Sequence, residues 1–199
     1  MSTHGPDGGS PTRRRPSGPP ASTIRPGSSG IGRRSSAEAE AVSDALRRGA
    51  DEYLTRRRRT SALSLLSIGS FAVVAAYQNG LLRHLPEPPL PRLAADQVDA
   101  SGEAYQYLKT PDAALGIASS AVTLILAGMG DANRSRHHRW IPLALAAKTL
   151  TDAIFGLFLT AEQATKHKKF CSWCLLAALA NLAAVPQTLP EARAAWRRQ

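Results

Sequence analysis

The sequence predicts an all-α fold: a four-helix transmembrane bundle with a disordered basic N-terminal tail and a short juxtamembrane helix. Three observations support this. Four apolar segments follow residue 60, the first 60 residues are polar and rich in arginine, and the basic residues are distributed unevenly between the loops. The chain has 199 residues and a net charge of +10. That length fits one domain with an appended tail.

Residues 1–34 are rich in Arg, Pro, Gly and Ser and have almost no large apolar side chains, so we expect a disordered cytoplasmic tail. Residues 1–60 contain twelve arginines and six acidic residues. We interpret this charge as one that fixes membrane orientation, and we expect no nucleic-acid partner. The same 60 residues lack the apolar core of a signal peptide, which predicts that the N-terminus stays in the cytoplasm.

Residues 35–59 are expected to form a juxtamembrane amphipathic helix. Ser35 and Glu38 have the spacing of a capping box, and Val42, Leu46 and Leu54 fall on roughly one face. The helix is expected to end in the run of arginines at 56–59 and to lie on membrane lipid along the inner leaflet.

The predicted domain, residues 60–190, contains spans at about 61–82, 113–129, 140–159 and 170–189, and a basic cytoplasmic tail follows at 191–199. The first span carries no charge and is long enough to cross a bilayer at 1.5 Å per residue. The second is short, and the third contains Lys148 and Asp152. Either would suit a soluble core, but four in series favour a membrane bundle.

The distribution of Lys and Arg predicts the orientation. With the N-terminus inside, residues 1–60, 130–140 and 190–199 lie inside and are all net positive, whereas the outer loop 83–112 is net negative. The lysines at 166, 168 and 169 are an exception on the outer side. We therefore predict a multi-pass protein of the inner or plasma membrane with both termini cytoplasmic.

The two cysteines, Cys171 and Cys174, form a C-x-x-C motif where the last span begins, which this topology puts at the outer face. Disulfides form and persist on that side. A helix N-terminus and nearby lysines also favour a thiolate, so the motif favours a redox-active dithiol. Two alternatives stay open: an inert or buried pair, and a metal site using His167 or His84. We expect no metal, because no convincing fourth ligand accompanies the pair.

The stretch "FCSWCLLAALANLAAV" resembles the vitamin K epoxide reductase family, in its bacterial type, whose last span opens with a C-x-x-C. The stretches "YQNGLLRHLPEPPLP" and "TPDAALGIASSAV" agree with it, and the likeness covers about residues 61–190. It implies four transmembrane helices around an outer quinone pocket. It also implies a two-electron exchange with menaquinone or ubiquinone, and a thioredoxin-like or other thiol donor outside the cytoplasm.

The resemblance implies roles for individual residues. Cys174 would donate to the quinone, and Cys171, nearer the surface, would exchange with an incoming thiol. Asp112 stands where the family often has a polar residue that bonds to the quinone carbonyl. Two features depart from the pattern: the loop after the first span has no cysteine pair, and Ala178 replaces a tyrosine. A non-enzymatic membrane scaffold that keeps the fold is therefore the alternative function.

Five further residues are candidates. Tyr77, Asn79 and His84 are expected near the quinone pocket, and their alternative roles are helix–helix bonding or interfacial anchoring. Lys148 and Asp152 have i, i+4 spacing inside the third span, which predicts either a self-neutralising pair or a proton relay. The stiff segment "PEPPLP" is expected to brace a cap over the pocket mouth.

Overall fold

The structure is a computed structural model that describes residues 36–100 and 109–197. The predicted disordered tail, residues 1–34, lies outside this part. In chain order the elements are α1 (Ala37–Arg48), α2 (Glu52–Gln78), α3 (Ala95–Asp99), α4 (Asp112–Gly128), α5 (Arg134–His137), α6 (Trp140–Glu162), a π-helical turn η2 (Gln163–His167) and α7 (Ser172–Trp196). Within the described ranges there is no named strand, and one isolated bridge joins Leu93 to Phe170. The all-α prediction is confirmed.

The predicted juxtamembrane helix is two helices. Ser36, not Ser35, caps α1, and α1 ends at Arg48. Asp51 then caps α2 by accepting hydrogen bonds from the backbone N–H groups of Tyr53 and Leu54. The arginines at 56–59 therefore lie in the first turns of α2 and do not end the preceding helix.

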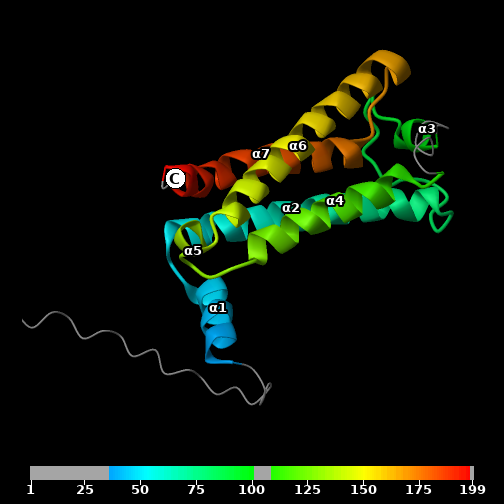
Figure 1. Cartoon of the computed structure of the whole chain (residues 1–199). Helices are drawn as coiled ribbons and strands as arrows, with labels where there is room; N and C mark the ends of the chain where they lie inside the picture. Colours follow the sequence, from blue (N-terminus) through cyan, green and yellow to red (C-terminus); the bar gives the residue numbers. More distant parts are fainter. Residues whose placement is uncertain (1–35, 101–108, 198–199) are drawn as a thin grey trace, which may run out of the picture. The chain divides into compact units, whose positions relative to one another are not determined.

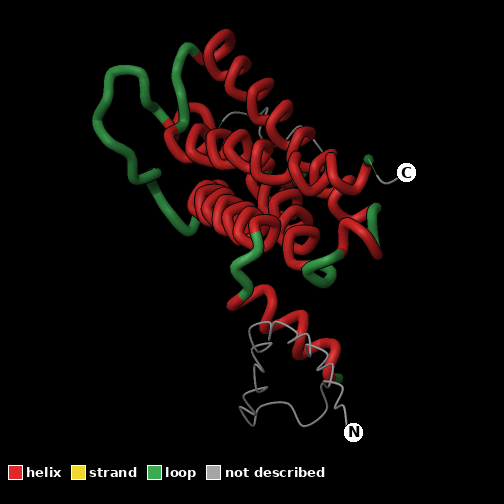
Figure 2. The backbone as a smooth tube through the Cα atoms, turned by 90° about the vertical axis from the view of Figure 1, so that its left-hand side faces the viewer, coloured by secondary structure: helices red, strands yellow, loops and turns green. Residues whose placement is uncertain are grey.

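The long helices pack in pairs (Figures 1 and 2). Helix α2 packs against α4 and α7, and α6 packs against α7. The contacts use small polar side chains: Ser64 donates to the carbonyl of Ser120 at 2.6 Å, and the hydroxyls of Thr149 and Thr188 lie 3.0 Å apart. Small residues and hydroxyl groups are typical of helix interfaces in membranes.

Large apolar side chains point outward from the same helices. They include Leu65, Val122, Ile125, Ile154 and Leu179. Three helices are long and apolar enough to cross a membrane: α2, α6 extended through η2, and α7. Helix α4 is apolar but only 17 residues long. The described residues therefore contain three helices of spanning length and one shorter apolar helix where a fourth span was predicted.

Two buried arginines close the end of α4. Arg57 of α2 donates to the carbonyl groups of Ala127, Met129, Gly130 and Asp131. Arg134 donates to the carbonyls of Leu126 and Met129 and forms an ion pair with Glu191 of α7 at 2.7 Å. These bonds satisfy carbonyl groups that a helix end leaves unpaired. Because α7 continues through Pro186 and Pro190 to Trp196, Glu191 is helical and does not belong to a tail.

Candidate functional site

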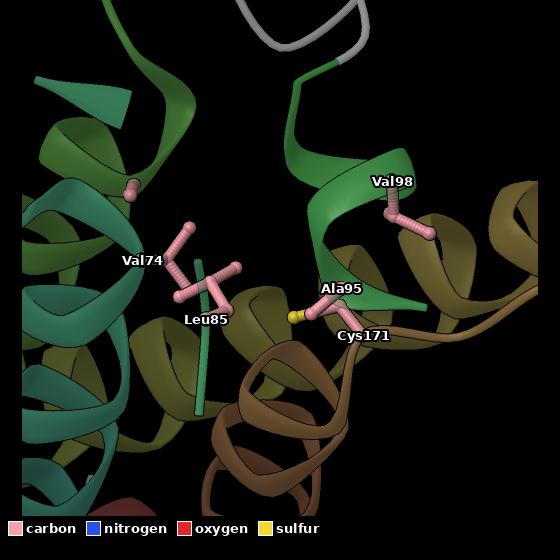
Figure 3. Close-up of a cluster of buried hydrophobic side chains, with 6 residues drawn as sticks. Val74, Leu85, Ala95, Val98 and Cys171 are labelled. Carbon is pink, nitrogen blue, oxygen red and sulfur yellow. The ribbon is translucent and has the colours of Figure 1, made fainter. Parts of the chain in front are cut away.

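The C-x-x-C motif forms the N-terminus of α7. Cys171 is the N-cap residue, and its sulfur accepts a hydrogen bond from the backbone N–H of Cys174 at 3.2 Å. Both cysteines are free thiols. Cys171 is fully buried, packed with Leu85, Ala95 and other apolar residues (Figure 3), whereas Cys174 is half-buried. The expectation that Cys171 is nearer the surface is therefore not met.

The backbone around Cys171 is held from two sides. The side-chain carbonyl of Gln163, in η2, accepts a hydrogen bond from the Cys171 N–H at 3.1 Å. Phe170 donates its N–H to the carbonyl of Arg92 and accepts from the N–H of Ala94. The motif thus sits between the end of α6 and the loop that precedes α3.

The proline-rich segment contacts the motif. Trp173 donates its indole N–H to the carbonyl of Pro86 at 2.8 Å, and Lys169 donates to the carbonyl of Pro91 at 3.2 Å. Ser172 donates its hydroxyl to Glu87 at 3.3 Å. The segment therefore bonds to residues on both sides of Cys171; that it braces a cap over a pocket mouth stays a prediction.

Asp99, at the end of α3, faces the cysteines. Its Oδ1 accepts a hydrogen bond from the thiol of Cys174 at 3.4 Å. Asp99 is 3% exposed, and its Oδ2 is buried with no hydrogen-bond partner among the described residues. Burial raises the pKa of the Asp99 carboxyl to about 6; hydrogen bonds from the Cys171 and Cys174 thiols oppose that shift, and the charges of Asp112 and Glu87 add to it.

Short helix α3 is fixed by several bonds to its surroundings. Glu87 accepts from the N–H of Ala95, and Asp96 accepts from the N–H of Leu85, both at 2.7 Å. His84 lies 2.8 Å from the other oxygen of Asp96. The amide of Gln78 donates to the carbonyl of Asp99 at 3.3 Å. These contacts hold the Asp99 carboxylate against Cys174.

Beside the motif lies a cavity of about 740 Å³. Cys174, Asp99 and Asp112 line one part of it. Its apolar walls come mainly from α2, α4 and α6 and include Phe71, Val74, Leu115, Phe155, Phe158 and Leu159. A cavity of this size and lining is typical of sites for small apolar molecules with a few polar groups.

Of the residues that the sequence predicts near the pocket, one lines the cavity and three do not. Asp112 lines the cavity, and the amide of Gln78 donates to its carboxylate at 2.7 Å. Tyr77, Asn79 and His84 are not among the lining residues that the structure describes. Tyr77 donates to the carbonyl of Asp96, Asn79 to that of Ala75, and His84 is exposed beside Asp96.

Lys148 and Asp152 line a different part of the cavity. The ammonium group of Lys148 lies 2.5 and 2.6 Å from the two carboxylate oxygens of Asp152. Ser119 and Thr123 of α4 donate their hydroxyls to the same carboxylate. The two charges neutralise each other inside the bundle, as their spacing predicted, and the pair faces the cavity.

Sequence reasoning missed Asp99 and Gln163 as site residues. Asp99 is one of several acidic residues in a net-negative loop, and nothing in its spacing distinguishes it. The amide of Gln163 follows an apolar span in the same way as many interfacial side chains do. Gln78, which links Asp112 to the Asp99 backbone, belongs with Tyr77 and Asn79 to the polar residues late in the first span, one of which the sequence predicts to face the pocket.

The sulfurs of Cys171 and Cys174 and a carboxylate oxygen of Asp99 all lie within 4.8 Å of one another. Closed structural zinc sites use four protein ligands. In the described ranges this group supplies three such side chains, and neither His84 nor His167 belongs to it. We assign it no metal.

Residues 60–189 match the family model described as the vitamin K epoxide reductase family. No curated protein matches the chain. The matched residues make up more than half of the sequence and contain α4, α6, the C-x-x-C motif and most of α2 and α7. The chain therefore belongs to the vitamin K epoxide reductase family, whose members are membrane oxidoreductases that act on disulfides and quinones.

Proposed function

We propose that this member of the vitamin K epoxide reductase family is a quinone-dependent thiol–disulfide oxidoreductase in which Cys171 and Cys174 are the redox centre. The two cysteines would take electrons from protein thiols outside the cytoplasm and pass them to a membrane quinone. The proposal places the motif at the outer face, with both chain termini in the cytoplasm. It rests on family membership together with the position of Cys174.

The observation that carries the proposal is that Cys174 lines the apolar cavity while the buried sulfur of Cys171 lies within 4.8 Å of the Cys174 sulfur. The residues present fit a quinone: phenylalanine and leucine side chains suit its ring and tail, and polar groups gather beside Cys174. Of the residues expected from the sequence, Asp112 is the best placed to bond to such a ligand: its carboxylate can accept from a quinol hydroxyl, and it can donate to a quinone carbonyl oxygen when it is protonated.

The chemistry balances as two exchanges. A donor dithiol reduces the Cys171–Cys174 disulfide, so that the donor gains a disulfide and the motif gains two thiols. The two thiols then re-form their disulfide and release two electrons and two protons, which a quinone accepts to become a quinol. The residues of the chain hold Cys174 at the cavity wall and bind and transfer these protons.

The buried position of Cys171 sets a condition on the first exchange. Thiol–disulfide exchange requires the attacking sulfur to reach its target. Leu85 and Ala95 pack with Cys171, and the proline-rich segment bonds to Trp173 within the motif. On this proposal the cover, made of the proline-rich segment and α3, moves aside when a donor thiol arrives.

We also propose that Lys148 and Asp152 relay protons to the cavity from the side away from the cysteines. Quinone reduction takes up two protons, and intramembrane ionisable residues are typical of proton pathways. The hydroxyls of Ser119 and Thr123 extend the bonded cluster along α4. Tyr77, Asn79 and His84 have no role in this proposal, because they lie outside the cavity lining.

The test is a thiol-alkylation mass-shift assay on isolated membranes that contain the full chain. The motif is reduced mildly, a soluble quinone is added, and the free thiols are counted by mass. We expect quinone to restore the disulfide in the wild type and a Cys174→Ala variant to keep its single thiol. If the wild-type thiols stay reduced with several quinones while the fold is intact, the enzyme proposal is wrong.

One observation favours the scaffold alternative. The chain has two cysteines, so no second pair can carry electrons to the buried Cys171. A scaffold would tolerate Cys171→Ser with no loss of any cellular function. The alkylation assay separates the alternatives directly, because a scaffold predicts thiols that never cycle.

A further inference from the structure

We propose that Asp99 is a catalytic proton acceptor that takes the proton of the Cys174 thiol and holds it at the cavity wall. This inference rests on the proposed function, because it assigns a residue to the thiol-oxidation step. The S–H bond of Cys174 breaks, an O–H bond forms on Asp99, and the electron pair stays on sulfur. The pair keeps one negative charge throughout.

The geometry supports the transfer. The Cys174 sulfur lies 3.4 Å from Asp99 Oδ1, which is within hydrogen-bond range for a thiol donor. Both groups line the same cavity, so a proton on Asp99 sits where a reduced acceptor needs one. No bond rotation or helix movement is needed to bring donor and acceptor together.

The second carboxylate oxygen of Asp99 is an atom that can bind the proton. Oδ2 is buried and has no hydrogen-bond partner in the described part of the chain. A buried, ionised carboxylate with an unpaired oxygen is costly, and protonation removes that cost. The raised pKa of about 6 agrees with this reading.

Asp96 offers a contrast within the same helix. Its carboxylate accepts the Leu85 N–H and lies beside His84, and among the described residues it makes no hydrogen bond to a cysteine. Although burial acts to raise it, these hydrogen bonds hold the pKa of Asp96 below its ordinary value. Asp96 thus stays ionised and structural, whereas Asp99 is arranged to change its protonation state.

Other titratable groups share the surroundings. Cys171, Asp112 and Glu87 act on Asp99 directly. Helix α3 packs on η2, and the end of α6 and η2 contribute Glu162, Lys166 and His167 to the cavity lining. The variants below leave these groups unchanged, so a difference between variants reports on Asp99 itself.

The first readout needs no quinone. The full chain in lipid nanodiscs is reduced, and the alkylation rate of Cys174 by iodoacetamide is measured by peptide mass spectrometry between pH 5 and pH 9. Above pH 6 the ionised Asp99 opposes a thiolate, so the wild-type rate should flatten. In Asp99→Asn the rate should keep rising, to about tenfold above wild type at pH 8.

The second readout is the rate of disulfide formation after a soluble quinone is added at pH 8. Asp99→Asn should be slower than wild type by about 10²- to 10⁴-fold, the usual contribution of a positioned acid or base. The variant would then react more slowly although its thiolate is more abundant. That split distinguishes a proton acceptor from a residue that only supplies charge.

Two variants serve as references. Asp99→Glu keeps a carboxylate and should restore part of the oxidation rate. Asp44→Asn removes a partly exposed carboxylate of α1 that pairs only with Arg48 among the described ion pairs, and it should behave as wild type in both readouts. Helical circular dichroism confirms that each variant is folded, and Asp99→Glu keeps the question open to measurement if Asp99→Asn does not fold.

The outcomes separate the two proposals. If quinone forms the disulfide in Asp99→Asn as fast as in wild type, Asp99 is not a proton acceptor. The same follows if disulfide formation in this variant accelerates together with the alkylation of Cys174. If its alkylation profile matches wild type, the carboxylate does not act on Cys174 and the inference is wrong at its first step. If wild-type Cys174 is never oxidised by quinone, the proposed function fails, whereas the alkylation profiles still decide whether Asp99 and Cys174 are coupled.

Discussion

Gln163 accepts a 3.1 Å hydrogen bond from the backbone N–H of Cys171, which ties the end of α6 to the residue that caps α7. Both residues are buried. Gln163 is the first residue of the π-helical turn η2, which follows α6 directly. Single-turn π-helices occur often at functional sites.

Replacing Gln163 with leucine should loosen Cys171. The buried N–H loses its acceptor, which costs about 1–3 kcal/mol. Where this cost lowers the free energy of locally opening the structure around Cys171, alkylation of Cys171 should accelerate about tenfold for each 1.4 kcal/mol. The matched control is Thr165→Val, in the same turn but exposed and bonded only to its own helix. Equal alkylation in the two variants would show that Gln163 does not hold the motif.

Glu191→Ala should be among the most destabilising single substitutions. Arg134 has no exposed surface, and its partner Glu191 is nearly as buried, so removal of the carboxylate leaves an uncompensated charge. We expect a loss of about 3–5 kcal/mol in the free energy of unfolding, measured by denaturant titration in detergent micelles. Glu162→Ala breaks the exposed pair with Lys166 and should cost less than about 1 kcal/mol. Similar losses in both variants would contradict the assigned role of burial.

The helices were predictable because their signals are local. Helix α4 begins at Asp112 directly after Pro111, and α6 begins at Trp140, as the apolar segments predicted. The break between α1 and α2 was missed because it depends on the side chain of Asp51 capping a new helix within a continuous amphipathic pattern. The first turns of α2 gave no sign that Arg57 would bond to carbonyls about 70 residues away.

The site was predictable only where spacing carries chemistry. The C-x-x-C spacing identifies Cys171 and Cys174 as a pair, and the i, i+4 interval identifies Lys148 and Asp152 as another. Asp99 reaches Cys174 from 75 residues earlier in the chain. Such a contact depends on how the loop after α2 folds back over α7, and no local pattern encodes that path.

The Lys148–Asp152 pair predicts non-additive substitutions. Lys148→Met leaves the carboxylate without its cation, and Asp152→Leu leaves the ammonium group without its anion. The double variant removes both charges, so it should be more stable than either single variant in a double-mutant cycle of unfolding free energies.

A proton relay adds a second expectation for that cycle. The folded double variant should oxidise Cys174 more slowly with quinone than wild type does. Thr151→Ala is the control, because Thr151 lines the same cavity but bonds to its own helix. A double variant that is stable and as fast as wild type would leave the pair with a structural role alone.

The raised pKa of Asp99 predicts an unusual pH dependence of stability. A carboxyl whose pKa is about 6 when folded and 3.8 as an ordinary group holds, between those values, a proton that the unfolded chain has released. Its contribution to stability therefore falls as the pH rises from about 4 to above 6, and it is constant beyond. The shift of about two pKa units corresponds to at most about 3 kcal/mol.

The measurement is the free energy of unfolding of wild type minus that of Asp99→Asn, at pH 4.5 and pH 7.5. We expect this difference to move in favour of wild type at the lower pH. Asp96→Asn provides the opposite case: the pKa of Asp96 is lowered, so its contribution is lost only below its ordinary value of 3.8, and the same difference should stay flat between pH 4.5 and pH 7.5. If the Asp99 difference is also flat, its carboxyl titrates as an exposed aspartate does, and the buried contact with Cys174 does not persist in the membrane.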